Sequence, residues 1–106
     1  MSKRKVIIRF RHIWTVHYEL RSQNTITSES FKTEELAWLD LGRTLRQWMA
    51  TYPPTAMTDE IVEWLGYKTI KAIKKARDLY EDYEQGPSAD RIWVEETRLV
   101  LSRTVQ

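Results

Sequence analysis

Apolar and polar side chains alternate along the first part of the chain, over positions 6–20. Successive side chains of a strand point to opposite faces of a sheet, so a period of two predicts a β-strand. The odd positions are mostly polar and include Arg9 and Arg11, which makes the second face basic. His12 alone interrupts the apolar row, which consists of Val6, Ile8, Phe10, Trp14, Val16, Tyr18 and Leu20.

A strand of this length does not fit straight into a small globule. Fifteen residues at about 3.3 Å each would span roughly 50 Å. A compact chain of this size has a radius of gyration of only about 13 Å. We therefore expect the strand to bend, to break, or to project as an arm. A β-bulge or a coiled long strand is the preferred form, with His12 as the interruption. A turn at 22–25 and an extended stretch over 26–31 then predict a hairpin.

Two helical stretches follow the predicted hairpin. Thr33 is the expected N-cap of the first, which ends at Tyr52 because two prolines come next. Thr58 is the expected N-cap of the second, which spans about 59–85. Gly66 lies inside this stretch, either as a tolerated interior glycine or as the C′ residue of a shorter helix.

β-branched and aromatic residues return from Arg91 onward, which favours one or two strands there and leaves a helix open as an alternative. The element order is ββααβ. The sequence thus predicts one α+β domain over 1–106, in which an antiparallel sheet, made of the N-terminal hairpin and the C-terminal strand, packs against two α-helices.

Composition narrows the class of protein. The chain has 106 residues, of which 42% are hydrophobic and 30% charged, as in ordinary globular domains. It has no apolar run near the roughly 20 residues that span a bilayer, and its arginine-interrupted start does not match a signal peptide. The absence of cysteine fits a reducing compartment, so we expect a cytoplasmic protein.

Residue spacing offers no catalytic signature. The three glycines are far apart, which excludes a phosphate-cradling loop. His12 and His17 lie on opposite faces of the predicted strand and do not converge on a metal. We expect a non-enzymatic protein with no catalytic residues, no metal and no cofactor.

Aromatic and acidic residues supply candidates for protein contacts. Four of the five tryptophans, namely Trp14, Trp38, Trp48 and Trp93, lie on predicted apolar faces and are expected in the core. Trp64 lies less centrally and is a candidate interface anchor. Glu81, Asp82 and Glu84 cluster at a helix end, where they form a solvated face or meet a basic partner.

Positive charge is concentrated in two places although the net charge is only +2. Residues 1–21 carry six Lys or Arg against one acid, and residues 64–77 carry no acid at all. The second cluster consists of Lys68, Lys71, Lys74, Lys75 and Arg77. Such local patches govern association more than net charge does.

The segment 58–77 contains EIVEWLGY followed by a basic stretch. It resembles the first helix and turn of helix-turn-helix DNA-binding elements, in which a basic second helix enters the major groove. That resemblance implies that the five cations of the second cluster face DNA. Ile70 and Ile73 come about two residues too early for the motif. We therefore favour the alternative, a single amphipathic helix with a solvated lysine face.

Together these observations predict a small binding protein that associates with nucleic acid, most directly double-stranded DNA, through the second cluster and the Arg9/Arg11 face. The alternative is a protein-interaction module or inhibitor that acts through a strand edge, through Trp64 and through the acidic residues at 81–84. That edge also allows a homodimer through the long first strand. In size and make-up the chain resembles accessory proteins of phages and mobile elements.

Overall fold

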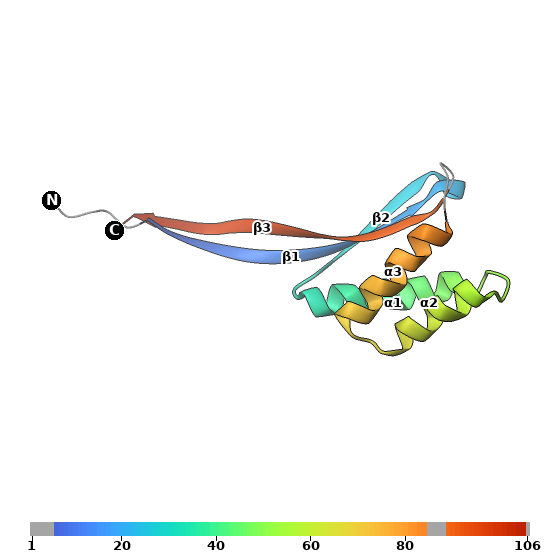
Figure 1. Cartoon of the computed structure of the whole chain (residues 1–106). Coiled ribbons are helices and arrows are strands. Elements are labelled where there is room, and N and C mark those ends of the chain that lie inside the picture. The colour runs from blue at the N-terminus through green and yellow to red at the C-terminus, as the bar shows by residue number, and fades with distance from the viewer. Residues whose placement is uncertain (1–5, 85–88, 106) are drawn as a thin grey trace.

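In the part of the chain that the structure describes, three strands form one antiparallel sheet, and three helices lie on one side of it (Figure 1). The computed structural model describes residues 6–84 and 89–105. The central strand β1 (Val6–Leu20) lies between β2 (Thr25–Phe31) and β3 (Arg91–Val105). The predicted α+β class, the antiparallel sheet and the hairpin of β1 and β2 are confirmed, and the C-terminal stretch is one strand.

The far ends of β1 and β3 leave the body of the molecule together. β1 pairs with β2 only over Trp14–Leu20, but with β3 over Val6–Glu19. Residues 6–13 and 97–105 therefore form a two-stranded ribbon, here called the arm (Figure 1). The protein measures 69 Å along its longest axis and has a radius of gyration of 18.4 Å. The long strand therefore projects as an arm, which was one of its expected outcomes.

A β-bulge is present in the arm, but not at the expected residue. The register between β1 and β3 shifts between Arg9 and Phe10, where Leu101 is left without a partner. His12 stays in register opposite Arg98, and its Nδ1 atom lies 2.6 Å from Glu96 Oε1. The expected interruption at His12 is therefore wrong. His12 is solvent-exposed, so its polar ring stays hydrated without any change in the register of the strand.

Helix ends follow their capping residues. α1 (Glu34–Met49) begins after Thr33, whose side chain accepts from the Leu36 amide, as predicted. α2 (Ala56–Gly66) begins after Thr55 and not after Thr58. Thr55 and Thr58 form a capping box in which each side chain accepts from the other's backbone N–H, and this reciprocal pair fixes the earlier start.

The predicted second helix is two helices, so the order is ββαααβ. α2 ends at Gly66 and α3 (Ile70–Tyr83) begins after Thr69. Lys68 has a left-handed φ of 56°, and the Thr69 hydroxyl accepts from the Ala72 amide at 3.2 Å. Both features end one helix and start another, which corrects the single-helix interpretation.

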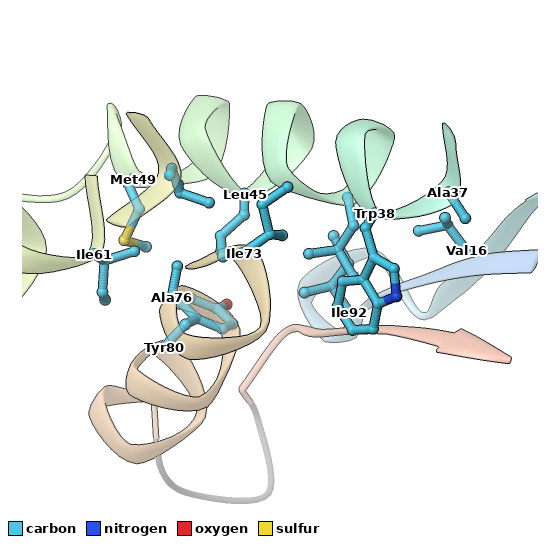
Figure 2. Close-up of a cluster of buried hydrophobic side chains, with 12 residues drawn as sticks. Val16, Ala37, Trp38, Leu45, Met49, Ile61, Ile73, Ala76, Tyr80 and Ile92 are labelled. Atoms are coloured by element: carbon cyan, nitrogen blue, oxygen red, sulfur yellow. The ribbon is translucent and has the colours of Figure 1, made fainter. Parts of the chain in front are cut away.

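The core lies among the three helices and against one face of the sheet (Figure 2). Trp38 lies in it, and Trp14 and Trp48 pack against it, as predicted. Trp93 does not, because it alternates with the core-facing Ile92 and Val94 and stacks on His17 at 5.1 Å between ring centroids. The largest fully buried side chains come from all three helices and from β1 and β3, namely Val16, Leu41, Leu45, Ile61, Ile73, Tyr80 and Ile92.

Candidate nucleic-acid interface

Lysine side chains surround the start of α3. Lys68 lies in the turn between α2 and α3, and Lys71 and Lys75 lie on the outer side of the first turns of α3. All three are exposed, and none of them forms an ion pair within the part of the chain that the structure describes. The opposite face of α3 is buried and includes Ala72, Ile73 and Ala76, so Lys71 and Lys75 face the solvent. The three ammonium groups are available to an anion.

The other two cations of the predicted cluster hold the fold together. Lys74 Nζ lies 3.7 Å from Glu34 Oε1 and 5.3 Å from the centroid of the Trp38 ring. Arg77 donates from Nε to the carbonyl oxygen of Ile92 at 2.9 Å and from Nη2 to Glu81 at 2.7 Å. These contacts tie α3 to α1 and to β3. They leave both side chains less free to meet a ligand than Lys71 and Lys75.

Two arginines that the sequence prediction did not include lie beside Lys68. Arg43 and Arg46 of α1 and Lys68 line one hollow of about 430 Å³, whose other walls are apolar and which no acid lines. Its floor includes Gly42, where a Cβ atom would stand 3.3 Å from Ile73, so α1 and α3 approach closely there. Arg43 also donates to the buried carboxylate of Asp40 at 2.6 Å. Arg43 and Arg46 lie close together because they are three residues apart in α1. Only the packing of α1 against α3 brings them beside Lys68 in the turn between α2 and α3.

The arm is the second basic surface, and it carries more arginines than the sequence analysis predicted. Arg9 and Arg11 of β1 are exposed, as expected for the polar face of the strand. Arg98 and Arg103 of β3 join them, and no acidic residue lies in 6–13 or 97–105. Arg98 and Arg103 are five residues apart, so simple alternation would put them on opposite faces. The bulge at Leu101 instead places both on one face of the arm, opposite the face of Arg9 and Arg11. The sequence could not have shown this, nor which segment the two arginines lie beside.

A hollow of about 500 Å³ lies between α3 and β3. Lys74, Arg77 and the acidic Asp78 of α3 line it on one side, and Trp93 and Val94 of β3 on the other. Its lining includes no residue of the arm and none of the three lysines at the start of α3. The hollow therefore does not join the two basic surfaces.

The residues predicted for protein contacts do not form one surface. Trp64 lies near the end of α2 and is half-buried, and the centroid of its ring lies 5.8 Å from that of Tyr67. Glu81 and Asp82 are exposed near the end of α3, and Glu84 is half-buried. Glu81 is already paired with Arg77. Trp64 thus lies near the start of α3, whereas the acidic residues lie near its end.

A row of polar side chains crosses the sheet and was not found from the sequence. His17 Nδ1 lies 2.7 Å from the Ser28 hydroxyl, and His17 Nε2 lies 3.8 Å from Glu95 Oε2. A serine, a histidine and a carboxylate in contact suggest nucleophilic chemistry. Such chemistry also needs donors aimed at a developing oxyanion, and His17 lines none of the hollows described above. The row accounts for cross-strand pairing of the three strands.

Residues 6–84 and 89–105 contain no group of three His, Asp or Glu side chains placed to hold a metal ion. Within the same residues, no helix is long and apolar enough to cross a membrane. Comparison with protein-family models, with curated proteins and with solved structures finds no match for this chain.

Proposed function

We propose that this protein is a non-enzymatic module that associates with double-stranded DNA. The observation that supports this most directly is the α2–turn–α3 segment, in which a short turn delivers exposed Lys68, Lys71 and Lys75 to the start of α3. The split into two helices brings this segment nearer to the helix-turn-helix elements that it resembles in sequence. The arm arginines Arg9 and Arg11 supply a second contact.

The mechanism is mainly electrostatic. Lysine and arginine side chains replace condensed counterions at the phosphates, so the observed affinity falls as salt rises. Contacts of this kind orient the protein on the duplex and carry little base preference by themselves. Lys74 and Arg77, which are engaged in ion pairs, contribute by holding α3 against the rest of the protein.

Fluorescence anisotropy of a labelled duplex at low and moderate salt tests this function. We expect binding at low salt that weakens steeply with salt, and we expect Lys71→Glu with Lys75→Glu to abolish it, because each change replaces attraction to phosphate by repulsion. Circular dichroism should show an unchanged fold, since both side chains are exposed.

The matched control is a single charge reversal, Arg21→Glu, at the end of the sheet away from the arm, compared with Lys71→Glu alone. Arg21→Glu should bind the duplex nearly as the unaltered protein does. Equal losses in the two single variants would show a response to net charge only. No binding of the unaltered protein at low salt would refute the proposed function.

One observation favours the alternative, a protein-interaction module. β3 is an edge strand, and β1 has no β2 partner before Trp14, so the arm has open backbone edges on both sides. Such edges can add a strand from a partner or from a second copy. Sedimentation velocity over a hundredfold range of concentration tests the second copy. A monomer throughout would refute a homodimer through the first strand.

A further inference from the structure

The arm combines positive charge with exposed apolar side chains, and only the charge is used by the proposed function. Seven of the large hydrophobic residues that the structure leaves exposed lie on it, namely Val6, Ile7, Ile8, Phe10, Leu99, Val100 and Leu101. Val100 and Leu101 are each 61% exposed. An apolar surface of this kind marks a site that a partner covers.

The two faces of the arm are not equivalent. Phe10 and Val100 are opposite each other and continue the face of β1 that carries the buried Val16, here called the core-side face. Arg98 lies on the same face, with its Cζ atom 5.8 Å from the centroid of the Phe10 ring. Ile7 and Leu99 lie on the other face with Arg9 and Arg11, here called the outer face.

Charge decides which partner fits. The described part of the arm carries Arg9, Arg11, Arg98 and Arg103 and no acid, so a second arm laid against it would place like charges together. A polyanion that also presents apolar groups matches both properties. The major groove of duplex DNA offers this combination, with phosphates along its walls and the methyl groups of thymine among the base edges at its floor.

Size and position agree with that partner. Eight residues at about 3.3 Å extend the arm by roughly 26 Å, which is shorter than one turn of B-DNA at about 34 Å. A two-stranded ribbon also fits the width of the major groove. The core-side face of the arm continues the face of β1 on which the helices pack.

We infer that the arm lies in a groove of duplex DNA with its core-side face inward, so that Phe10 and Val100 contact the groove floor. Arg98 and Arg103 lie on that same face and contact the phosphates of the groove walls, while the outer-face Arg9 and Arg11 reach the phosphates at the groove rim. This inference rests on the proposed function and adds to it a second, apolar contact. The apolar contact releases no counterions, so it contributes affinity that does not depend on salt.

Duplex binding measured over a range of salt separates the apolar contact from the ionic ones. We expect Phe10→Ser with Val100→Ser to weaken binding by about tenfold or more at every salt concentration. The slope of log K against log salt should stay unchanged, because no charge is removed. The matched control is Ile7→Ser with Leu99→Ser, which removes two exposed apolar side chains from the outer face and should change affinity less than about twofold.

Each other outcome overturns the inference in a distinct way. Equal losses from both double variants, or no loss from either, would show that the core-side face does not enter a groove, while binding by the unaltered protein would still support the proposed function. A dimer that becomes a monomer on Phe10→Ser with Val100→Ser would show that a second copy covers this face. If the unaltered protein does not bind duplex at all, the proposed function fails first.

Discussion

Tyr80 shows how one buried polar group constrains the fold. The side chain is 1% exposed, its hydroxyl donates to the carbonyl oxygen of Asp90 at 3.1 Å, and its ring contacts Trp48. Burial, followed by the neighbouring Tyr52, raises the pKa of Tyr80 far above its ordinary value. The hydroxyl thus links the end of α3 to the start of β3 and stays protonated while the protein is folded.

This raised pKa makes stability depend on pH in the alkaline range. Below about pH 10 the tyrosine is neutral in both states, and its contribution is fully present. Above that pH the unfolded chain ionises while the folded protein does not, so the free energy of unfolding falls by about 1.4 kcal/mol per pH unit for this group. Tyr80→Phe should therefore show a smaller loss of stability between pH 9 and 11.

Urea unfolding followed by tryptophan fluorescence measures this difference. The two proteins share their lysines and the remaining tyrosines, so these groups cancel in the comparison, apart from Tyr52, whose pKa depends partly on Tyr80. Tyr80→Phe should be less stable at pH 8, by about 1 kcal/mol for the lost hydrogen bond. Parallel losses of stability above pH 10 in both proteins would contradict the prediction.

At the scale of elements, the boundary between α2 and α3 is set by the residues after Gly66 and not by Gly66 itself. Gly66 has open space where a Cβ atom would stand, whereas Lys68 has the left-handed φ and Thr69 supplies the cap. In a sequence, a glycine within a helical pattern is a recognisable signal of a possible helix end. The left-handed position at Lys68 has no such mark, because lysine rarely adopts that conformation.

Substitutions at the turn test this assignment. Lys68→Gly should raise the free energy of unfolding by about 1 kcal/mol, because glycine adopts a positive φ without steric cost. Gly66→Ala should raise it by up to about 1 kcal/mol through helix propensity. Thr69→Ala should lower it by about 1 kcal/mol through loss of the cap. Urea titrations measure all three, and a loss on Gly66→Ala would contradict the assignment.

For the whole molecule, the arm is the part with the least support from its neighbours. It is a two-stranded ribbon beyond β2 and the helices, and its side chains through Arg103 are exposed or half-buried. Isolated two-stranded ribbons are marginally stable in water. The arm should therefore open locally more often than the three-stranded part of the sheet.

Amide hydrogen exchange of the free protein measures that difference. The amides of 7–11 that face β3 should exchange at least about 100-fold faster than those of Val16–Tyr18, because only β3 holds them. Duplex DNA should slow exchange in the arm if it covers the ribbon. Equal protection of both regions in the free protein would contradict this prediction.

Much of the fold was predictable because it depends on local patterns. The period of two in β1, the cap at Thr33 and the helical spacing of α1 all act over a few residues, and all three predictions are confirmed. The capping box at Thr55 was also local, but Thr58 with its following acids was the stronger signal of a helix start. The candidate site was less predictable, because Lys71 and Lys74 look alike in the sequence and differ only in what lies beside them.

The sequence by itself determined the strand and helix content, the antiparallel hairpin and the two clusters of positive charge, because side-chain alternation, capping and charge are properties of neighbouring residues. Only the tertiary structure decided that β3 runs beside β1 for its whole length, which turns a long strand into an arm and adds Arg98 and Arg103 to it. Packing also decided that Arg77 is engaged within the fold while Lys71 and Lys75 stay open. These outcomes depend on contacts between residues far apart in the chain, and no local pattern specifies them.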